Sequence, residues 1–552
     1  MVDTLARSDQ DIDGGVASLS NRARFWLLTV AALDVLLVIS SMVALNAALP
    51  DMAVQTAATQ TQLTWIVDGY TLVLACLLLP AGAIGDRYGR RGALLVGLAI
   101  FAVASVSPTV FDSPVQIIVA RAAAGLGAAF IMPATLSLLT AAFPRSERNK
   151  AVGIWAGVAS SGAVVGFMGA GLLLKYFSWP SIFYGFAASA LVLFIATCTI
   201  SSSRDETATP LDWLGAVLIG GAVAVFVFGV VEAPVRGWTH PVVWGCMSLG
   251  VVLAVVFAVV ELRREHPLLD IRLFGRPDFA TGAVGITCLF FANFGFFFVS
   301  MQYMQLILGY SPLQTAFALT PLAVPIMVLG ATLHLYLPKI GLRTAVALGL
   351  FLIGAGLFCM RYLDAGSAYI DMVWPFLIVS TGIGLCVAPT TSAIMNAVPD
   401  EKQGVASAVN DTTREVGAAV GIAVAGSVLA AQYNDVLRPA LAGLPDQVRE
   451  SALDSLAHAL AVADQMGPQG TRLADLAESA FIQSMDLSLL VIAATVMVAS
   501  AFVAVWAPGR NGKQFGFLRN DDEVSGPVTD HHDGGVRSPA GDGGKHRAVD
   551  DP

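Results

Sequence analysis

Long apolar runs alternate with short polar segments along most of the chain, and this pattern predicts membrane-spanning helices. A helix needs about 20 apolar residues to cross about 30 Å of hydrocarbon. Fourteen runs fit that length: 26–48, 64–82, 93–112, 115–139, 151–174, 181–200, 213–232, 241–261, 280–302, 313–336, 344–361, 372–396, 404–431 and 486–507. The pattern therefore predicts an all-α integral membrane protein with 14 transmembrane helices.

Basic residues between the runs predict the orientation of the chain. Arg and Lys gather in the segments 83–92, 142–150, 262–279 and 337–343. With fourteen spans these segments all lie on the side of the N-terminus. Because basic loops stay in the cytoplasm, we expect both termini to be cytoplasmic.

The spacing of the runs predicts two similar halves. The basic turn Gly82–Gly92, which reads GAIGDRYGRRG, has a degenerate counterpart at Lys339–Arg343. Repeated six-helix halves are typical of secondary transporters. The expected parts are a cytoplasmic tail 1–25, a first half 26–200, an inserted helix pair 213–261, a second half 280–507 with an outer loop 432–485, and a disordered cytoplasmic tail 508–552. The outer loop carries Leu and Ala at helical spacing, which predicts a short amphipathic helix.

Composition agrees with a membrane protein and argues against an enzyme. Hydrophobic residues make up 56% of the chain and charged residues 13%, against about 25% charged residues in soluble domains. The six cysteines lie in apolar runs, which favours packing over disulfides or metal. The chain shows no Walker-type phosphate loop, no Ser-His-Asp set and no metal-binding helix. Without a phosphate loop the chain is not expected to hydrolyse ATP, so transport by it would draw on an ion gradient. We expect no cofactor, no metal and no nucleic-acid partner.

Two ionisable residues lie inside the early apolar runs. Asp34 follows Trp26 by eight residues, about 12 Å along a helix, which places it near the middle of the membrane. A carboxyl at that depth is a candidate proton carrier, and the alternative is a structural bond to a neighbouring helix. Arg121 in the fourth run stays charged, so it can modulate a proton site or hold a structural Asp.

Three further charged residues are candidates for proton coupling. Asp68 lies near the outer end of the second run, where it is either a proton entry group or a solvated helix end. Arg414 and Glu415 end the polar segment NDTTRE inside the long thirteenth run. They point apart on a helix, so each is expected to need a partner from another helix. The alternative is a solvated helix end at the membrane surface.

The turn Gly82–Gly92 is a candidate inner gate. Glycine permits a tight turn, Asp86 can cap the next helix or pair with arginine, and the arginines can bridge helices. The gate candidates are Gly82, Gly85, Asp86, Arg87, Gly89, Arg90 and Arg91. Anchoring by basic residues is the alternative, and it accounts for Asp86 least well.

Aromatic side chains crowd the ninth run and favour apolar or cationic ligands. Some of them must face lipid, because a span has a lipid side. The substrate-cavity candidates are Ser41, Asn46, Asn293, Phe294, Phe297 and Gln302.

Several stretches resemble the fourteen-span drug:proton antiporters of the major facilitator superfamily, especially the actinobacterial type. They include WIVDGYTLVLACLLLPAGAIGDRYGRRG at 65–92, the Arg121 segment, EHPLLDIRLF at 265–274, GYSPLQTAFALTP at 309–321 and GVASAVNDTTREVGAAVGIAV within 389–431. The resemblance implies the major facilitator fold. It also implies a multi-pass monomer in the bacterial plasma membrane that exports apolar or cationic small molecules in exchange for protons.

The chain departs from this family at three places. Members of the family usually have an aspartate shortly before the sequence ALP. This chain has Ser41 at that position, and Asp34 lies seven residues earlier. The fifth run has Phe167 where the family has proline and Ala170 where it has the first glycine of a pair, and Pro180 replaces an arginine. These changes leave open the export of an endogenous metabolite or lipid by symport or facilitation, and a non-transporting membrane sensor.

Overall fold

The computed structural model describes residues 20–56, 58, 60–110, 113–201, 211–265, 267–441 and 445–509. Every regular element in these ranges is a helix, and fourteen helices are long and apolar enough to cross a membrane, as predicted. Helices form because the hydrocarbon offers no hydrogen bonds to backbone groups. Most of the predicted N-terminal tail and nearly all of the predicted C-terminal tail lie outside the described residues.

The first half holds six spans and one short helix at a span end. They are α2 (Asn21–Ala44), α3 (Leu49–Thr56), α4 (Gln60–Tyr88), α5 (Arg90–Val106), α6 (Pro114–Ala142), α7 (Arg145–Tyr176) and α8 (Pro180–Thr197). Ser20 caps α2 by accepting a hydrogen bond from the amide of Ala23.

The second half repeats this plan with more breaks. Its helices are α11 (Pro277–Gln302), α12 (Pro312–Leu319), α13 (Ala323–Ala331), α14 (Leu333–Cys359), α15 (Tyr369–Asn396), α16 (Gln403–Leu437) and α19 (Thr471–Trp506). A 3₁₀ turn at Thr320–Leu322 joins α12 and α13 into one span, and α11 runs into a π-helical turn at Tyr303–Ile307.

Corresponding glycines make the sharp turns after the second span of each half. Gly89, with φ 114°, is the only residue between α4 and α5. Gly341, with φ 77°, breaks α14 between Lys339 and Arg343. A residue with a side chain is strained at such φ values, so glycine is required at both turns. The sequence predicts a turn over Gly82–Gly92, but the observed turn is Gly89 alone, because α4 continues to Tyr88 and α5 begins at Arg90.

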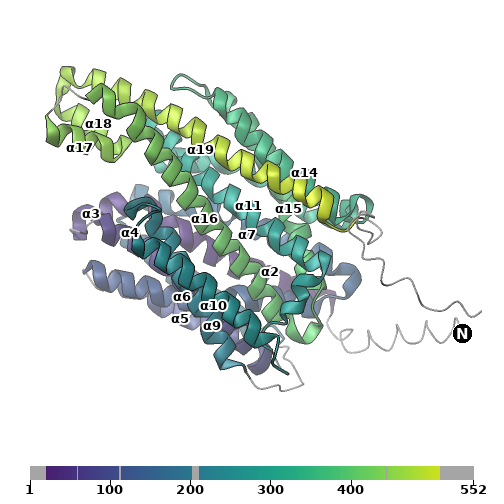
Figure 1. The fold of residues 1–552 in the computed structure, drawn as a ribbon. Coiled ribbons are helices and arrows are strands. Elements are labelled where there is room, and N and C mark those ends of the chain that lie inside the picture. Colours follow the sequence, from purple (N-terminus) through teal and green to yellow (C-terminus); the bar gives the residue numbers. More distant parts are fainter. Residues whose placement is uncertain are drawn as a thin grey trace, which may run out of the picture. The chain divides into compact units, whose positions relative to one another are not determined.

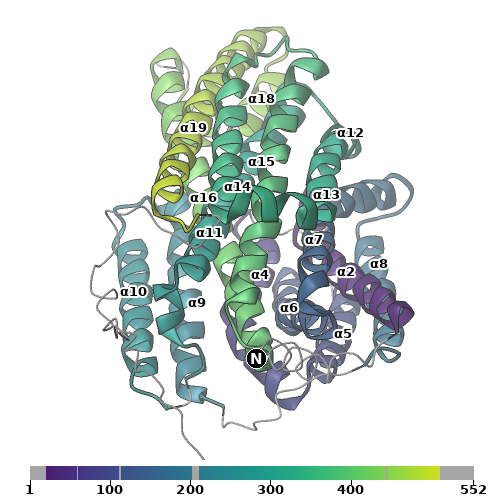
Figure 2. The same ribbon diagram turned by 90° about the vertical axis from the view of Figure 1, so that its right-hand side faces the viewer.

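The inserted pair, α9 (Trp213–Arg236) and α10 (Pro241–Glu261), packs against both halves through α9 (Figure 2). Helix α9 contacts α4 of the first half and α16 of the second. Trp65 lies against Phe228, and Trp238 donates a 2.7 Å hydrogen bond to Ser427. The pair therefore covers the seam where α4 meets α16.

Two helices of the second half are much longer than the apolar runs that predict them. Helix α16 has 35 residues and α19 has 36, or roughly 50 Å each at 1.5 Å per residue. Their far ends carry α17 (Asp446–Asp454) and α18 (Leu456–Gln465), as Figure 1 shows. The expected single amphipathic helix is split at Ser455, whose side chain caps α18.

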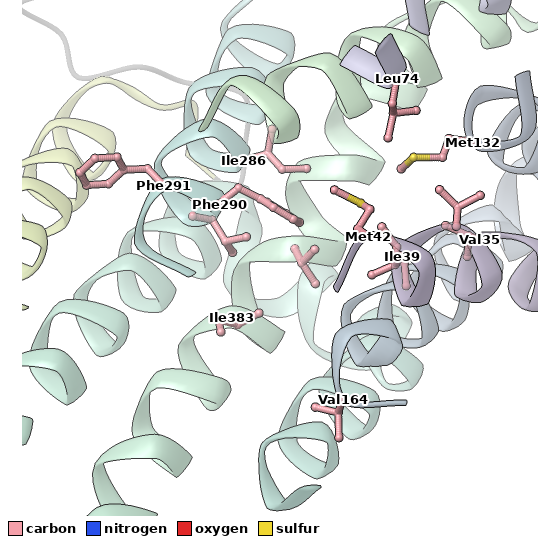
Figure 3. Close-up of a cluster of buried hydrophobic side chains, with 14 of the residues drawn as sticks. Val35, Ile39, Met42, Leu74, Met132, Val164, Ile286, Phe290, Phe291 and Ile383 are labelled. Carbon is pink, nitrogen blue, oxygen red and sulfur yellow. The ribbon is translucent and has the colours of Figure 1, made fainter. Parts of the chain in front are cut away.

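The halves approach most closely at the end of the bundle that carries Gly89 and Gly341, here called the loop end. A Cβ atom on Gly82 would lie 2.5 Å from the carbonyl oxygen of Gly404, and one on Gly153 would lie 2.1 Å from that of Gly330. Bare glycines therefore permit both approaches. Farther from this end, apolar side chains of α2, α4 and α6 face those of α11 and α15 (Figure 3).

Candidate functional site

Asp86 at the end of α4 joins the two halves at the loop end. Its carboxylate accepts hydrogen bonds from the amides of Gly404 (2.9 Å) and Val405 (3.1 Å), the first turn of α16. It also accepts a 2.8 Å bond from Nε of Arg90. A carboxylate at a helix N-terminus satisfies free amides and opposes the helix dipole. Asp86 therefore caps a helix of the other half rather than the helix that follows it.

A second set of polar contacts crosses the halves beside Asp86. The guanidinium of Arg90 donates to the carbonyl oxygen of Asp400 at 2.9 Å, and that of Arg148 donates to the Asp400 carboxylate at 3.1 Å. Asn396 donates to Asn149 at 3.2 Å. We call Asp86, Arg90, Arg148 and Asp400 the clamp. Both halves must separate here for the loop end to open.

Three other gate candidates, Gly85, Arg87 and Arg91, lie beside the clamp and make contacts within the first half. Arg91 donates to the carbonyl oxygen of Cys198 within the first half, and Arg87 lies 5.5 Å from the ring centre of Tyr88. At Gly85 a Cβ atom would lie 3.4 Å from Cβ of Ala93, so the two helices of the turn are in contact. The candidates therefore divide between the clamp and the turn that positions it.

Arg121 is buried between α2, α4 and α6. Its guanidinium donates to the hydroxyl of Ser41 (2.9 Å), to the carbonyl oxygen of Ser41 (3.1 Å) and to that of Ile66 (3.1 Å). Its charge also lies 4.2 Å from the ring centre of Tyr70. Ser41 thus fills the place beside Arg121 where the resembling family carries aspartate, and the prediction that Arg121 modulates a proton site stays a prediction.

We expect Arg121→Lys to destabilise the first half by about 2–4 kcal/mol, because an ammonium cannot bridge α2 and α4 as a planar guanidinium does. Unfolding of the purified protein in detergent measures the change. Arg449→Lys is the matched control, since Arg449 forms an exposed pair with Asp446 on α17 and its replacement should change stability little. Equal stability of the two variants would contradict a bridging role for Arg121.

Asp34 is fully buried in α2, and neither of its carboxylate oxygens has a hydrogen-bond partner among the described residues. An ionised carboxylate in that position is costly. The neutral acid therefore suits this arrangement, and ionisation requires a rearrangement that admits water or a cation. The role of Asp34 as a proton carrier stays a prediction.

The polar segment of α16 forms a buried charged belt at the boundary of the halves. Arg414 lies 3.4 Å from Asp411, and its guanidinium is 4.5 Å from the ring centre of Phe290 and 5.9 Å from that of Trp155 in the first half. Glu415 is buried and lies within electrostatic range of Tyr70, the residue under Arg121. The sequence predicts that Arg414 needs a partner from another helix; its ring contacts are on other helices, but its ion-pair partner is Asp411 of its own helix. Burial also excludes a solvated helix end.

Asp68 is half-buried in α4 and faces the inserted pair. Its electrostatic neighbour is Glu232 of α9, which is paired with Arg236. Asp68 is therefore remote from the clamp, at the other end of α4.

The substrate-cavity candidates divide between buried and accessible positions. Ser41 is buried and bonded to Arg121, whereas Asn46 is exposed and donates to the carbonyl oxygen of Val43. Phe294, stacked on Phe290 at 6.0 Å, and Phe297 are half-buried on α11. Gln302 and Asn293 are also half-buried, but their hydrogen bonding differs. Gln302 donates to the carbonyl oxygen of Phe298, whereas Oδ1 of Asn293 has no partner among the described residues.

Some residues of the site were missed by sequence reasoning. Asp411 lies in the candidate segment NDTTRE, but its pairing with Arg414 was not predicted, although residues three apart meet on a helix. Tyr70, Trp155 and Asp400 carry no comparable signal, because their roles depend on contacts between distant segments. Within the described ranges no group of three or more potential ligand residues could hold a metal ion.

Comparison with known proteins agrees with this architecture. The family model of the Major Facilitator Superfamily matches residues 32–422. The chain is 32% identical over 497 residues to the multidrug resistance protein Stp of Mycobacterium tuberculosis, covering 88% of this chain and 92% of that protein. It is also 32% identical over 499 residues to the multidrug efflux pump LfrA of Mycolicibacterium smegmatis, covering 90% and 98%.

Solved structures show the same fold at low sequence identity. The human organic anion transporter MFSD10 aligns with a TM-score of 0.56 at 15% identity, over 87% of this chain and 99% of that one. The proton:xylose symporter XylE aligns with a TM-score of 0.57 at 12% identity, over 90% and 98%. The chain is therefore a multi-pass membrane transporter that belongs to the Major Facilitator Superfamily.

Proposed function

We propose that this transporter exports amphipathic or cationic small molecules in exchange for protons, by alternating access. The relatives named for multidrug resistance and efflux support this class of substrate. The observation that carries the proposal is the set of buried charges on both sides of the boundary between the halves, Arg121 with Tyr70 and Asp411 with Arg414 and Glu415. Such charges are costly inside a membrane, so their presence in the spans supports a role in moving ions or substrate.

The clamp supports alternating access in a bacterial plasma membrane. We place the loop end, with its basic residues, and both termini in the cytoplasm. In the described arrangement the clamp is closed there. Its opening would separate Asp86 from the start of α16 and expose the charged belt to the cytoplasm. The chain would act as a monomer in contact with membrane lipid and without a cofactor.

Proton coupling would use Glu415 and Asp34. Glu415 is buried next to Arg414, which lies against Trp155 of the first half, so we expect its charge to depend on whether the halves are together. Asp34 lacks a polar partner among the described residues, so it gains one only when the helices move. Arg121 and Arg414 stay charged and stabilise the ionised carboxylates. Asp68, beside Glu232, would lie on the proton path at the other end.

Aromatic faces support binding of cations. Two buried arginines already lie over rings, Arg121 over Tyr70 and Arg414 over Phe290. A cationic substrate could occupy similar positions on the half-buried rings of Phe294 and Phe297. Asn293 would supply a polar contact, because its oxygen has no partner in the described part of the chain.

The test is transport of a lipophilic cation in proteoliposomes with an imposed pH gradient. We expect the gradient to drive accumulation against the substrate gradient, and Asp34→Asn to reduce that accumulation at least fivefold. Asp51→Asn, at an exposed position of α3, is the control and should transport normally. Accumulation that ignores the pH gradient would refute coupling, and normal coupled transport by Asp34→Asn would refute only the role of Asp34.

A further inference from the structure

A groove of about 530 Å³ lies between α2, α7 and α8, outside the charged site. Its walls include Leu36 and Leu37 of α2, Val165 and Leu173 of α7, and Leu193 of α8. This volume is within the range of about 300–1,000 Å³ found for small-molecule sites. The groove is therefore large enough to hold a ligand.

Small residues create this space. Gly169 of α7 and Gly185 of α8 line the groove, and a Cβ atom on Gly169 would meet no other atom within 4 Å. At Gly166, one turn away, a Cβ atom would lie 2.7 Å from the backbone of Ser40. Helices α2 and α7 thus touch along one line, and the groove opens beside it.

The lining is almost entirely apolar. The polar side chains that line the groove belong to Ser40 and Ser189, and no charged residue lines it. The hydroxyl of Ser40 already donates a 3.0 Å bond to the carbonyl oxygen of Gly162. A polar ligand would lose its hydration here without adequate replacement. The chemistry therefore fits a hydrocarbon chain.

The groove opens on the membrane face of the first half. Leu33, Val165 and Val192 at its edges are exposed, and Figure 2 shows α8 on the flank away from α11 and α15. The wall on α2 runs from Leu33 to Ala44, the part of the span farther from the loop end. At this face the surrounding medium is the acyl chains of one leaflet.

We propose that the groove binds one acyl chain of a phospholipid from the leaflet opposite the loop end. The chain would fill the space that Gly169 and Gly185 leave and would pack on the part of α2 that carries Ser41, the partner of Arg121. The groove is thus a lipid site that supports the position of α2. This proposal does not depend on the substrate or on proton coupling.

The test uses the full chain in lipid nanodiscs containing a phospholipid with a photoactivatable diazirine on one acyl chain. After illumination, peptide mapping should find adducts in α2, α7 and α8 at least fivefold more often per residue than in α10. Gly169→Leu should reduce the groove adducts at least fivefold. Gly245→Leu is the matched control, because Gly245 is an exposed glycine of α10 with open space around it.

Ser189→Leu is a second filling variant, in case Gly169→Leu fails to fold, and it should give the same loss of adducts. Adducts spread evenly over α8 and α10, or unchanged by both filling variants, would overturn the proposal. Displacement of the label by an excess of lipophilic cation, at constant lipid composition, would assign the groove to substrate instead and would also overturn it.

Discussion

Asp86→Asn is expected to open the loop end and reduce transport at least tenfold. Asparagine keeps one acceptor for the start of α16 but leaves the buried guanidinium of Arg90 without its carboxylate. The Arg90 pair lies within the first half, so the closed arrangement is weakened through the two amides of α16, one of which loses its carboxylate oxygen. Losing a hydrogen bond to a charged group costs about 1.5–3 kcal/mol, so the ratio of closed to open molecules should drop about tenfold to a hundredfold.

Cysteine labelling measures this opening directly. Ser407 of α16 is fully buried one turn beyond the clamp contact at Gly404, so Ser407→Cys is a nearly isosteric reporter in a background without native cysteines. A polar maleimide should label it at least tenfold faster when Asp86→Asn is present. Arg91→Gln, which loses a bond within the first half only, should leave the rate unchanged. Equal rates in all three proteins would rule out the clamp as the gate.

Glu415→Gln is expected to abolish uphill export while sparing downhill exchange. Glutamine keeps the shape of glutamate but cannot bind and release a proton. Proton flow down the pH gradient can therefore no longer drive substrate movement. One proton crossing 100 mV contributes about 2.3 kcal/mol, or roughly fiftyfold accumulation. The steady-state accumulation ratio of a lipophilic cation in proteoliposomes should therefore fall toward one.

Exchange of labelled for unlabelled substrate across the same membranes separates coupling from binding. Glu415→Gln should retain this exchange, because Arg414 still lies on Phe290. Glu478→Gln, at a partly exposed glutamate of α19, should behave as the wild type in both assays. If Glu415→Gln accumulates substrate normally, Glu415 is not the proton site.

The fold could be predicted from the sequence because each span is a local feature. Twenty apolar residues commit a segment to the membrane, and basic turns such as Gly82–Gly92 mark one side. Hydropathy cannot show where a helix ends once it leaves the membrane. For that reason α16 and α19 extend beyond the runs 404–431 and 486–507.

The candidate site was predictable only in part, since its partners are distant in sequence. Ionisable residues inside apolar runs, such as Asp34, Arg121 and Glu415, are visible because the membrane makes them costly. Their partners are not visible: Ser41 lies 80 positions from Arg121, and Gly404 lies 318 from Asp86. The carbonyl and amide groups that complete these contacts belong to the backbone, so no residue type signals them.

The most direct test of the central claim follows protons and substrate together. Proteoliposomes with a pH-sensitive dye in the lumen would receive a gradient of lipophilic cation and no imposed pH gradient. The account predicts proton movement opposite to the substrate in the wild type, and none in Glu415→Gln although substrate still exchanges. Substrate flux through the wild type without any proton movement would contradict it.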